Sequence, residues 1–78
     1  MMIRIYADFN SKDEQGRVRL STVGSRKDIE RHRASLKEGL EVILYMTDDC
    51  EVRGTLTFDE IWLGIPDWNT IRHYKTNK

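Results

Sequence analysis

The sequence predicts an α+β domain that is mostly β, either a small barrel or a strongly curved antiparallel sheet, with one helix. Several short segments alternate apolar and polar residues with a period of two, which is typical of half-buried strands. One segment between the second and third of them has helical spacing instead. The chain has 78 residues, a length that allows a single domain. We therefore expect one domain with the element order ββαβββ.

The first two strands are expected on either side of a polar loop. Residues 2–9 alternate, with the odd-numbered side chains apolar and turned inward. The loop that follows has no apolar residue and ends in Gly16, which is typical of a hairpin connection. Residues 17–23 alternate again, with Val18 and Leu20 inward.

The single helix is expected over residues 26–37. Ser25 followed by Asp28 is close to a capping box, in which side-chain oxygens accept the free amides of a helix start. Gly39 is placed to end the helix in the left-handed conformation. The apolar stripe of this helix is narrow, so the helix should pack on a larger element. It consists of Ile29 and Leu36, with His32 beside them.

Three consecutive strands should complete the sheet as a meander. Residues 40–46 are apolar at nearly every position, as in a strand that is covered on both faces. Residues 50–58 alternate clearly, and residues 61–65 resume an apolar face. Turns at Asp48-Asp49 and Asp59-Glu60 separate the three strands.

The faces of the meander follow from its register. Pairing across Asp48-Asp49 turns Val42 and Leu44 toward the core and places Ile43 and Tyr45 beside Arg53. If Asp59-Glu60 is a two-residue connection, Phe58 faces Ile61, and a one-residue slip would bury threonines and expose aliphatic side chains. The core face of the last two strands then consists of Val52, Leu56, Phe58, Ile61, Leu63 and Ile65. The outer face consists of Tyr45, Arg53, Thr55, Thr57 and Trp62.

The spacing of these strands resembles that of small SH3-like barrels. The resemblance covers about half of the chain and is carried by Glu38-Gly39, Val42, Leu44-Tyr45, Gly54, Leu56, Phe58 and Trp62. It implies a barrel geometry and no particular activity, because the acidic and aromatic ligand loops of the peptide-binding members are missing here. An OB-type barrel fits less well, because its extra helix usually follows the third strand.

Charge is unevenly distributed along a chain whose formal net charge is zero. Residues 1–37 carry nine basic and five acidic side chains, residues 38–70 one basic and eight acidic, and residues 71–78 three basic, so the sum of +4, −7 and +3 is zero. Two interpretations are open: the blocks neutralise one another inside the fold, or they form separate binding patches. We place the globular domain at residues 1–71 and a basic tail at 72–78.

Two classes of partner fit these patterns, and both describe a binding module without catalysis. The first is a protein, either an unknown partner or a second copy, bound by an aromatic and arginine surface. Its candidate residues are Tyr45, Arg53, Trp62 and Trp68. In the competing interpretation, Tyr45 and Trp62 lie under the helix as part of the core. The alternative partner is RNA or DNA, bound by a basic strand, helix and tail. Its candidate residues are Arg17, Arg19, Arg26, Arg33, Lys37, Arg72 and Lys75.

Catalytic, metal and cofactor sites are not expected from the sequence. Cys50 is the only cysteine and has acidic neighbours, which disfavour the thiolate of a nucleophile. Asp28 and His32 are four residues apart, a spacing that suits chelation, but two ligands do not make a metal site. A single cysteine fits a reducing compartment, and the chain has neither the apolar stretch of a signal peptide nor a membrane span. We expect a cytoplasmic protein with no membrane partner.

Overall fold

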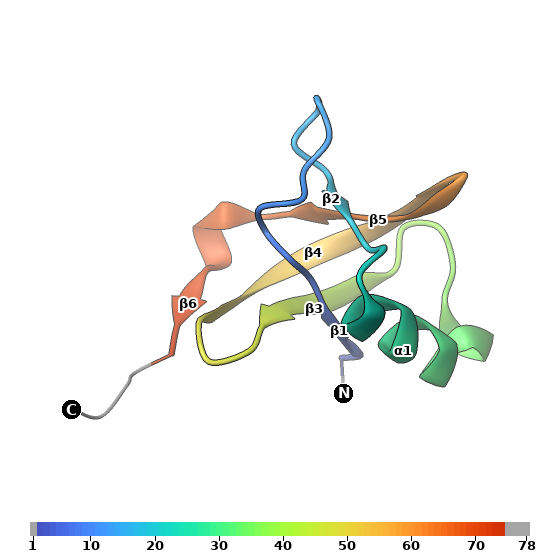
Figure 1. Ribbon diagram of the computed structural model, residues 1–78, viewed down its shortest axis with the longest axis horizontal. Coiled ribbons are helices and arrows are strands. Elements are labelled where there is room, and N and C mark those ends of the chain that lie inside the picture. The colour runs from blue at the N-terminus through green and yellow to red at the C-terminus, as the bar shows by residue number, and fades with distance from the viewer. Residues whose placement is uncertain (1, 75–78) are drawn as a thin grey trace.

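A curled, half-barrel sheet with one α-helix beside its edge makes up the computed structural model, which describes residues 2–74 (Figure 1). The predicted fold class, mostly β with one helix, is confirmed. The strands are β1 (Arg4–Tyr6), β2 (Val18–Arg19), β3 (Glu41–Met46), β4 (Cys50–Asp59), β5 (Ile61–Pro66) and β6 (Arg72–His73). The helices are α1 (Val23–Arg31) and two 3₁₀ turns, η1 (Arg33–Ser35) and η2 (Trp68–Thr70).

The strand order is β1-β3-β4-β5-β2, and β6 pairs with the start of β4. Two expectations were wrong here. The pair β1–β3 is parallel, so the sheet is mixed, and β1 and β2 lie at opposite edges instead of forming a hairpin. The polar loop between them closes on itself, because the Asp13 carboxylate accepts the amides of Gln15 and Arg17 and because Lys12 bridges to Val18. The loop therefore forms a small hairpin of its own.

Helix α1 begins earlier and ends earlier than the predicted helix over 26–37. The capping residue is Thr22, whose hydroxyl accepts the amide of Ser25 at 3.1 Å. The helix ends at Arg31, and the short turn η1 then leads to Leu36, whose backbone is extended. Gly39 has the expected positive φ of 83°, but it lies in the loop before β3 instead of ending the helix.

The core lies on the inner face of the curled sheet. The predicted inward positions of the first segment and of β3 are confirmed, because Ile5, Val42 and Leu44 are fully buried. The register across the turn that precedes Cys50 is also as predicted, with Ile43 opposite Arg53. The buried cluster consists of Ile5, Ala7, Phe9, Val18, Leu20, Val42, Leu44, Cys50, Val52 and Leu56.

The predicted register between β4 and β5 was wrong by one residue. Phe58 lies opposite Trp62 instead of Ile61, because the chain reverses around Glu60, which has a positive φ of 66°. Trp62 consequently shares the inner face with Gly64, and Ile61, Ile65 and Leu63 belong to the opposite face. Leu63 is nevertheless buried, as predicted, whereas Ile61 and Ile65 are exposed. Phe58 was expected in the core and is 55% exposed at the end of the strand.

The segment expected as a basic tail begins inside the sheet. Arg72 and His73 form β6, where they pair with Glu51 and Cys50 of β4. The amide of Tyr74 donates to the carbonyl of Asp49 at 2.9 Å and so continues this pairing. Residues 75–78 lie outside the described range. None of the helices within residues 2–74 is long and apolar enough to cross a membrane.

Candidate functional site

The four residues of the predicted interaction face do not lie on one surface. Tyr45 and Arg53 occupy the outer face of neighbouring strands, as expected. Trp62 lies on the other face of the sheet, where it packs against the core. Trp68 belongs to η2, and its ring contacts Phe9 edge-on at 5.4 Å between centroids. The residues of the predicted face therefore lie at three separate positions on the molecule.

The Trp62 region forms part of a groove between α1 and the hairpin that joins β4 and β5. One hollow of 360 Å³ has residues of both elements in its wall, and an adjoining hollow of 520 Å³ runs along α1. The two hollows share Arg26 and Ile29, and we call them together the α1–hairpin groove. Its lining consists of Leu20, Ser21, Val23, Arg26, Lys27, Ile29, Glu30, Phe58, Ile61 and Trp62.

Exposed apolar side chains line this groove. Phe58 packs edge-on against Trp62 with the ring centroids 5.1 Å apart, yet it is 55% exposed. Val23, at the start of α1, is 72% exposed, and Ile61 is 38% exposed. Large apolar side chains that are exposed together on a small domain indicate an interaction surface.

Charges of both signs flank the groove. Arg26 and Lys27 project from α1, and within residues 2–74 neither has a carboxylate at salt-bridge distance. Asp59 and Glu60 lie at the tip of the hairpin and are exposed. The Asp59 carboxylate is 3.7 Å from the Arg17 guanidinium, a long and solvent-exposed contact. Arg26 and Lys27 thus line the α1 wall together with Glu30, and the acidic tip of the hairpin lies beside the opposite wall without lining it.

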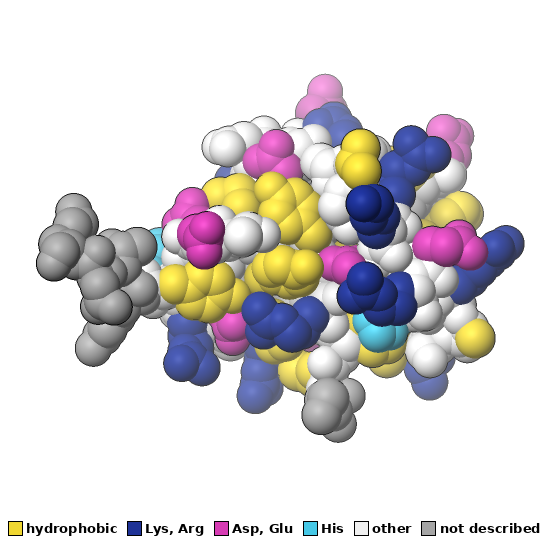
Figure 2. All heavy atoms as spheres, turned by 60° about the horizontal axis from the view of Figure 1, so that its bottom comes forward, with side chains coloured by type: hydrophobic (Ala, Val, Ile, Leu, Met, Phe, Trp, Pro, Cys, Tyr) yellow, Lys and Arg dark blue, Asp and Glu magenta, His cyan; other side chains and the backbone are white. Residues whose placement is uncertain are grey.

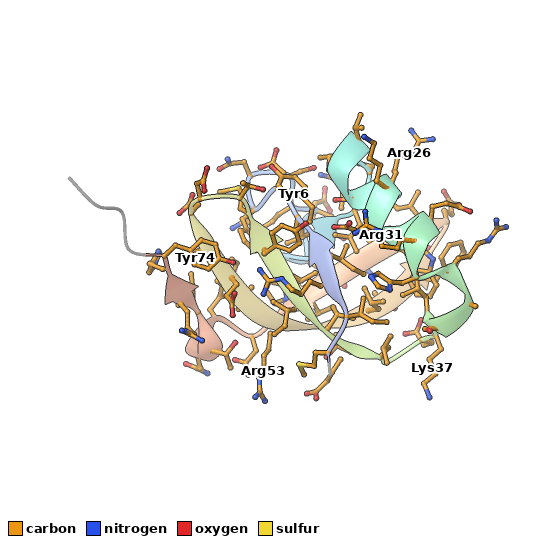
Figure 3. All side chains as sticks on the ribbon, turned by 90° about the horizontal axis from the view of Figure 1, so that it is seen from below. Tyr6, Arg26, Arg31, Lys37, Arg53 and Tyr74 are labelled. Carbon is orange, nitrogen blue, oxygen red and sulfur yellow. The ribbon has the colours of Figure 1, made fainter. Side chains whose placement is uncertain are left out.

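A second surface, the tyrosine face, covers the outer side of β1, β3 and the start of β4. Figure 2 shows apolar side chains gathered in the middle of this side of the molecule, with basic and acidic groups around them. Tyr6, Arg31 and Tyr74 lie on this side in Figure 3. The rings of Tyr6 and Tyr45 meet edge-on at 5.8 Å, and the Arg4 guanidinium lies 4.8 Å from the Tyr45 ring centroid.

Most polar groups of the tyrosine face bind one another. The Arg4 guanidinium donates to Glu51 at 3.0 Å and to the Tyr74 hydroxyl at 3.0 Å, and that hydroxyl donates to Glu51 at 2.9 Å. The Tyr45 hydroxyl donates to Asp28 of α1 at 3.0 Å. Burial, followed by the bond to this carboxylate, raises the pKa of Tyr45. The face is thus a closed network that holds β6 and α1 to the sheet.

The Glu51 carboxylate makes this network sensitive to pH. The hydrogen bond from Arg4, and after it the one from Tyr74, lowers the pKa of Glu51 below its ordinary value of 4.5. A carboxylate whose pKa is lowered by folding stabilises the fold above its unfolded pKa, and this contribution is lost as the pH falls through the folded pKa. Urea unfolding should therefore show that Glu51→Gln lowers the free energy of unfolding most near about pH 7 and progressively less below about pH 4.5.

Glu41→Gln is the matched control, because Glu41 is exposed at the start of neighbouring β3. It should follow the wild-type pH profile closely. An equal loss of stability in Glu51→Gln at acid and neutral pH would contradict the assigned ion pair.

The basic residues of the predicted nucleic-acid surface are dispersed. Arg17 binds the Asp13 carboxylate at 2.7 Å, and Arg33 lies 3.4 Å from Glu30. Arg72 belongs to β6, at the end of the sheet away from α1 (Figure 1). The side chains of Arg26 and Lys37 project from α1 and from the loop after it (Figure 3). The last of the predicted residues, Lys75, lies outside the described range.

Of Asp28 and His32, the two residues with chelating spacing that were not expected to form a metal site, Asp28 is engaged in hydrogen bonds that hold the fold together. Asp28 is buried, and one of its carboxylate oxygens accepts the Tyr6 amide as well as the Tyr45 hydroxyl. A different group of possible ligands, which the sequence analysis missed, lies at the start of β4. One ligand atom each from Asp49, Cys50 and His73 lies within 4.8 Å of the others. The signal was weak, because His73 is 23 residues from Cys50 in sequence and its strand has only two residues.

The thiol of this group has the character expected from the sequence. Burial, and then the nearby charge of Asp49, raises the pKa of Cys50 above its ordinary value. A raised pKa keeps the thiol protonated near neutral pH and disfavours a free nucleophile.

Comparison with known proteins adds no assignment, since no protein-family model, curated protein or solved structure matches the chain. The resemblance to SH3-like barrels stays a prediction.

Proposed function

We propose that the protein is a non-enzymatic interaction module that binds a second copy of itself through the α1–hairpin groove. The observation that supports this proposal is the gathering of exposed apolar side chains there. Within residues 2–74 five large hydrophobic residues are exposed, and three of them, Val23, Phe58 and Ile61, line this groove. An apolar centre with a charged rim is the usual anatomy of a protein interface.

Charge complementarity favours a second copy over a different partner. A two-fold dimer brings the same surface of each copy together, so that each feature meets its counterpart on the other copy. Around a two-fold axis that runs along the groove, Arg26 and Lys27 of one copy face Asp59 and Glu60 of the other. The aromatic pair then lies at the centre of the interface, where hot-spot residues concentrate.

Truncation of the exposed aromatic residue tests the interface. Phe58→Ser should weaken dimerisation at least about 10-fold, because hot-spot aromatics contribute more than 1–2 kcal/mol each. Ile65→Ser is the matched control, because Ile65 is also large, apolar and 44% exposed but does not line the groove. Sedimentation equilibrium over a range of protein concentrations measures both. A monomeric wild type, or equal dissociation constants for the two variants, would contradict the proposal.

A charge exchange then distinguishes self-association from capture of another protein. Arg26→Glu and Glu60→Arg should each weaken the dimer, and the two substitutions in one chain should restore it, because both contacts across the axis become favourable again. Failure of the double variant to recover would mean that these walls do not face each other.

Nucleic-acid binding, the second function suggested by the sequence, has less support. Its basic residues are spread over the polar loop, β2, α1, η1, the loop before β3 and β6, and two of the arginines are already paired with carboxylates. Titration with single-stranded oligonucleotides at low salt tests it, since binding that weakens steeply with salt would favour this partner. The cytoplasm is the compartment that we propose, because the single cysteine fits a reducing environment.

A further inference from the structure

Three side chains of the types that serve as metal ligands in proteins meet at the end of the sheet opposite α1 (Figure 1). They come from Asp49 in the turn before β4, from Cys50 at the start of β4 and from His73 in β6. One carboxylate oxygen, the thiol sulfur and one imidazole nitrogen all lie within 4.8 Å of one another. Among residues 2–74 this is the one group of three such side chains that lies so close.

The backbone places the thiol and the imidazole side by side. Cys50 lies directly opposite His73 in the antiparallel pair of β4 and β6. The neighbouring pair is hydrogen-bonded, because the Tyr74 amide donates to the Asp49 carbonyl at 2.9 Å. Hydrogen-bonded and non-hydrogen-bonded pairs alternate along an antiparallel ladder, so Cys50 and His73 occupy a non-hydrogen-bonded pair, where side chains approach most closely.

The short strand β6 is held in this position by contacts outside the group. The Tyr74 hydroxyl exchanges hydrogen bonds with Arg4 and Glu51 on the tyrosine face, at 3.0 and 2.9 Å. The adjacent residue His73 is therefore held to the sheet at its backbone while its side chain is exposed. Preorganised backbone with an adjustable imidazole suits a ligand set that closes around an ion.

The three ligands differ in exposure in a way that leaves an entry path. Cys50 is 5% exposed and forms the floor of the site, whereas Asp49 and His73 are exposed. An ion can approach from solvent through the carboxylate and the imidazole and reach the sulfur last.

We propose that Asp49, Cys50 and His73 bind a zinc-class divalent ion, with water as the fourth ligand. Zn²⁺ accepts sulfur, nitrogen and oxygen donors together in tetrahedral geometry. Binding of the ion displaces the proton of the Cys50 thiol to solvent and leaves a thiolate ligand. Mg²⁺ and Ca²⁺ prefer oxygen ligands alone, so the thiolate and the imidazole select against them. Bond lengths of about 2.0–2.3 Å place neighbouring ligands of a tetrahedral zinc about 3.5 Å apart. The trio therefore needs only a small contraction, which the exposed side chains can supply.

Binding of Co²⁺, a spectroscopic substitute for Zn²⁺, tests the site. Reduced wild-type protein should bind one Co²⁺ per chain and develop both a thiolate-to-metal charge-transfer band and the visible bands of a tetrahedral ion. Added Zn²⁺ should remove these bands by competition. A folded, reduced protein that develops no charge-transfer band would overturn the proposal.

Substitutions identify the ligands. Asp49→Asn and His73→Gln should each weaken binding at least about 10-fold, since even outer-shell changes at metal sites cost 10–100-fold. Asp48→Asn and His32→Gln are the matched controls, because they remove the same groups from an adjacent turn residue and from the end of α1, and they should leave the affinity unchanged. Equal effects of ligand and control substitutions would mean nonspecific surface binding and overturn the assignment.

Cys50→Ser should abolish the charge-transfer band, with circular dichroism to check the fold. If this buried substitution unfolds the protein, the exposed positions Asp49 and His73 decide the question. The test is separate from that of the α1–hairpin groove, because the two sites lie at opposite ends of the sheet (Figure 1).

Discussion

Replacing Asp28 with alanine is expected to lower the free energy of unfolding by about 3–5 kcal/mol, because hydrogen bonds to a charged group are each worth about 1.5–3 kcal/mol. The buried carboxylate accepts the Tyr6 amide at 2.9 Å and the Tyr45 hydroxyl at 3.0 Å. Its loss leaves an edge-strand donor without a partner under α1. Such a loss is a large part of the about 5–15 kcal/mol that holds a typical domain folded.

The loss of unfolding free energy should depend on how many hydrogen bonds the new side chain can still accept. Asp28→Asn keeps one carbonyl oxygen for the amide and should cost about half as much. Glu30→Ala is the control, since Glu30 is exposed on the same helix and, within residues 2–74, its carboxylate has a single ion pair, with Arg33 at 3.4 Å. Thermal and urea unfolding measure all three variants. A loss in Asp28→Ala no larger than that in Glu30→Ala would show that α1 does not hold the edge of the sheet.

Asp28 also explains why α1 lies where it does. The Tyr6 carbonyl accepts a hydrogen bond from the Ser25 hydroxyl, so both backbone groups of this edge residue are bound by side chains of one helix. An edge strand with unpaired backbone groups invites pairing with other chains. Helix α1 covers the edge, and Ser25 is fully buried by doing so. This role replaces the capping role that the sequence predicts for Ser25 and Asp28.

Local patterns predicted the fold where the chain pairs with its near neighbours. The turn at Asp48-Asp49 set the register of β3 and β4, and the alternation of those strands gave the buried positions correctly except for Phe58 near the end of β4. The parallel pairing of β1 with β3 could not be predicted this way, because the residues it joins are almost forty positions apart, for example Ile5 and Leu44. Nothing in the local sequence distinguishes such a partner from a neighbouring hairpin strand.

The wrong prediction that Trp62 shares the outer face with Tyr45 followed from the ambiguous turn between β4 and β5. Both faces of β5 look apolar, one through Ile61, Leu63 and Ile65, the other through Trp62. Hydrophobicity alone favoured the aliphatic face as core. The reversal at Glu60, in a conformation that non-glycine residues rarely adopt, chose the other face. That shift moved Trp62 away from Tyr45 and brought it beside Phe58, which created the α1–hairpin groove.

The glycines of β4 and β5 indicate which face of β5 belongs to the core. Gly54 and Gly64 both face Leu44, and a methyl group at either position would lie 2.5 Å or 2.8 Å from its Cδ1 atom. The core face of β5 is therefore the face that carries Gly64. The Leu44 side chain fills the space that a side chain at this position would occupy. A pattern of apolar side chains does not identify a glycine that belongs to the core because it has no side chain.

Enlarging Gly54 should consequently be among the most costly changes in the protein. Gly54→Ala is expected to lower the free energy of unfolding by about 1–3 kcal/mol through overpacking. The new methyl group would also lie 3.1 Å from the Ile65 carbonyl oxygen, which is backbone and cannot move aside. Thr55→Ala, on the outer face of the same strand, is the control and should cost less.

The contact between Leu44 and Gly54 can be measured as a coupling free energy in a double-mutant cycle. Leu44→Ala should cost about 2–5 kcal/mol, because the side chain is fully buried and the space it leaves is not refilled. In that background the methyl group of Gly54→Ala enters the empty space, so the double variant should be at least about 1 kcal/mol more stable than the sum of the single changes predicts. Strictly additive losses in urea unfolding would mean that Leu44 does not occupy the space above Gly54, and the observed register of β4 and β5 would then have to be abandoned.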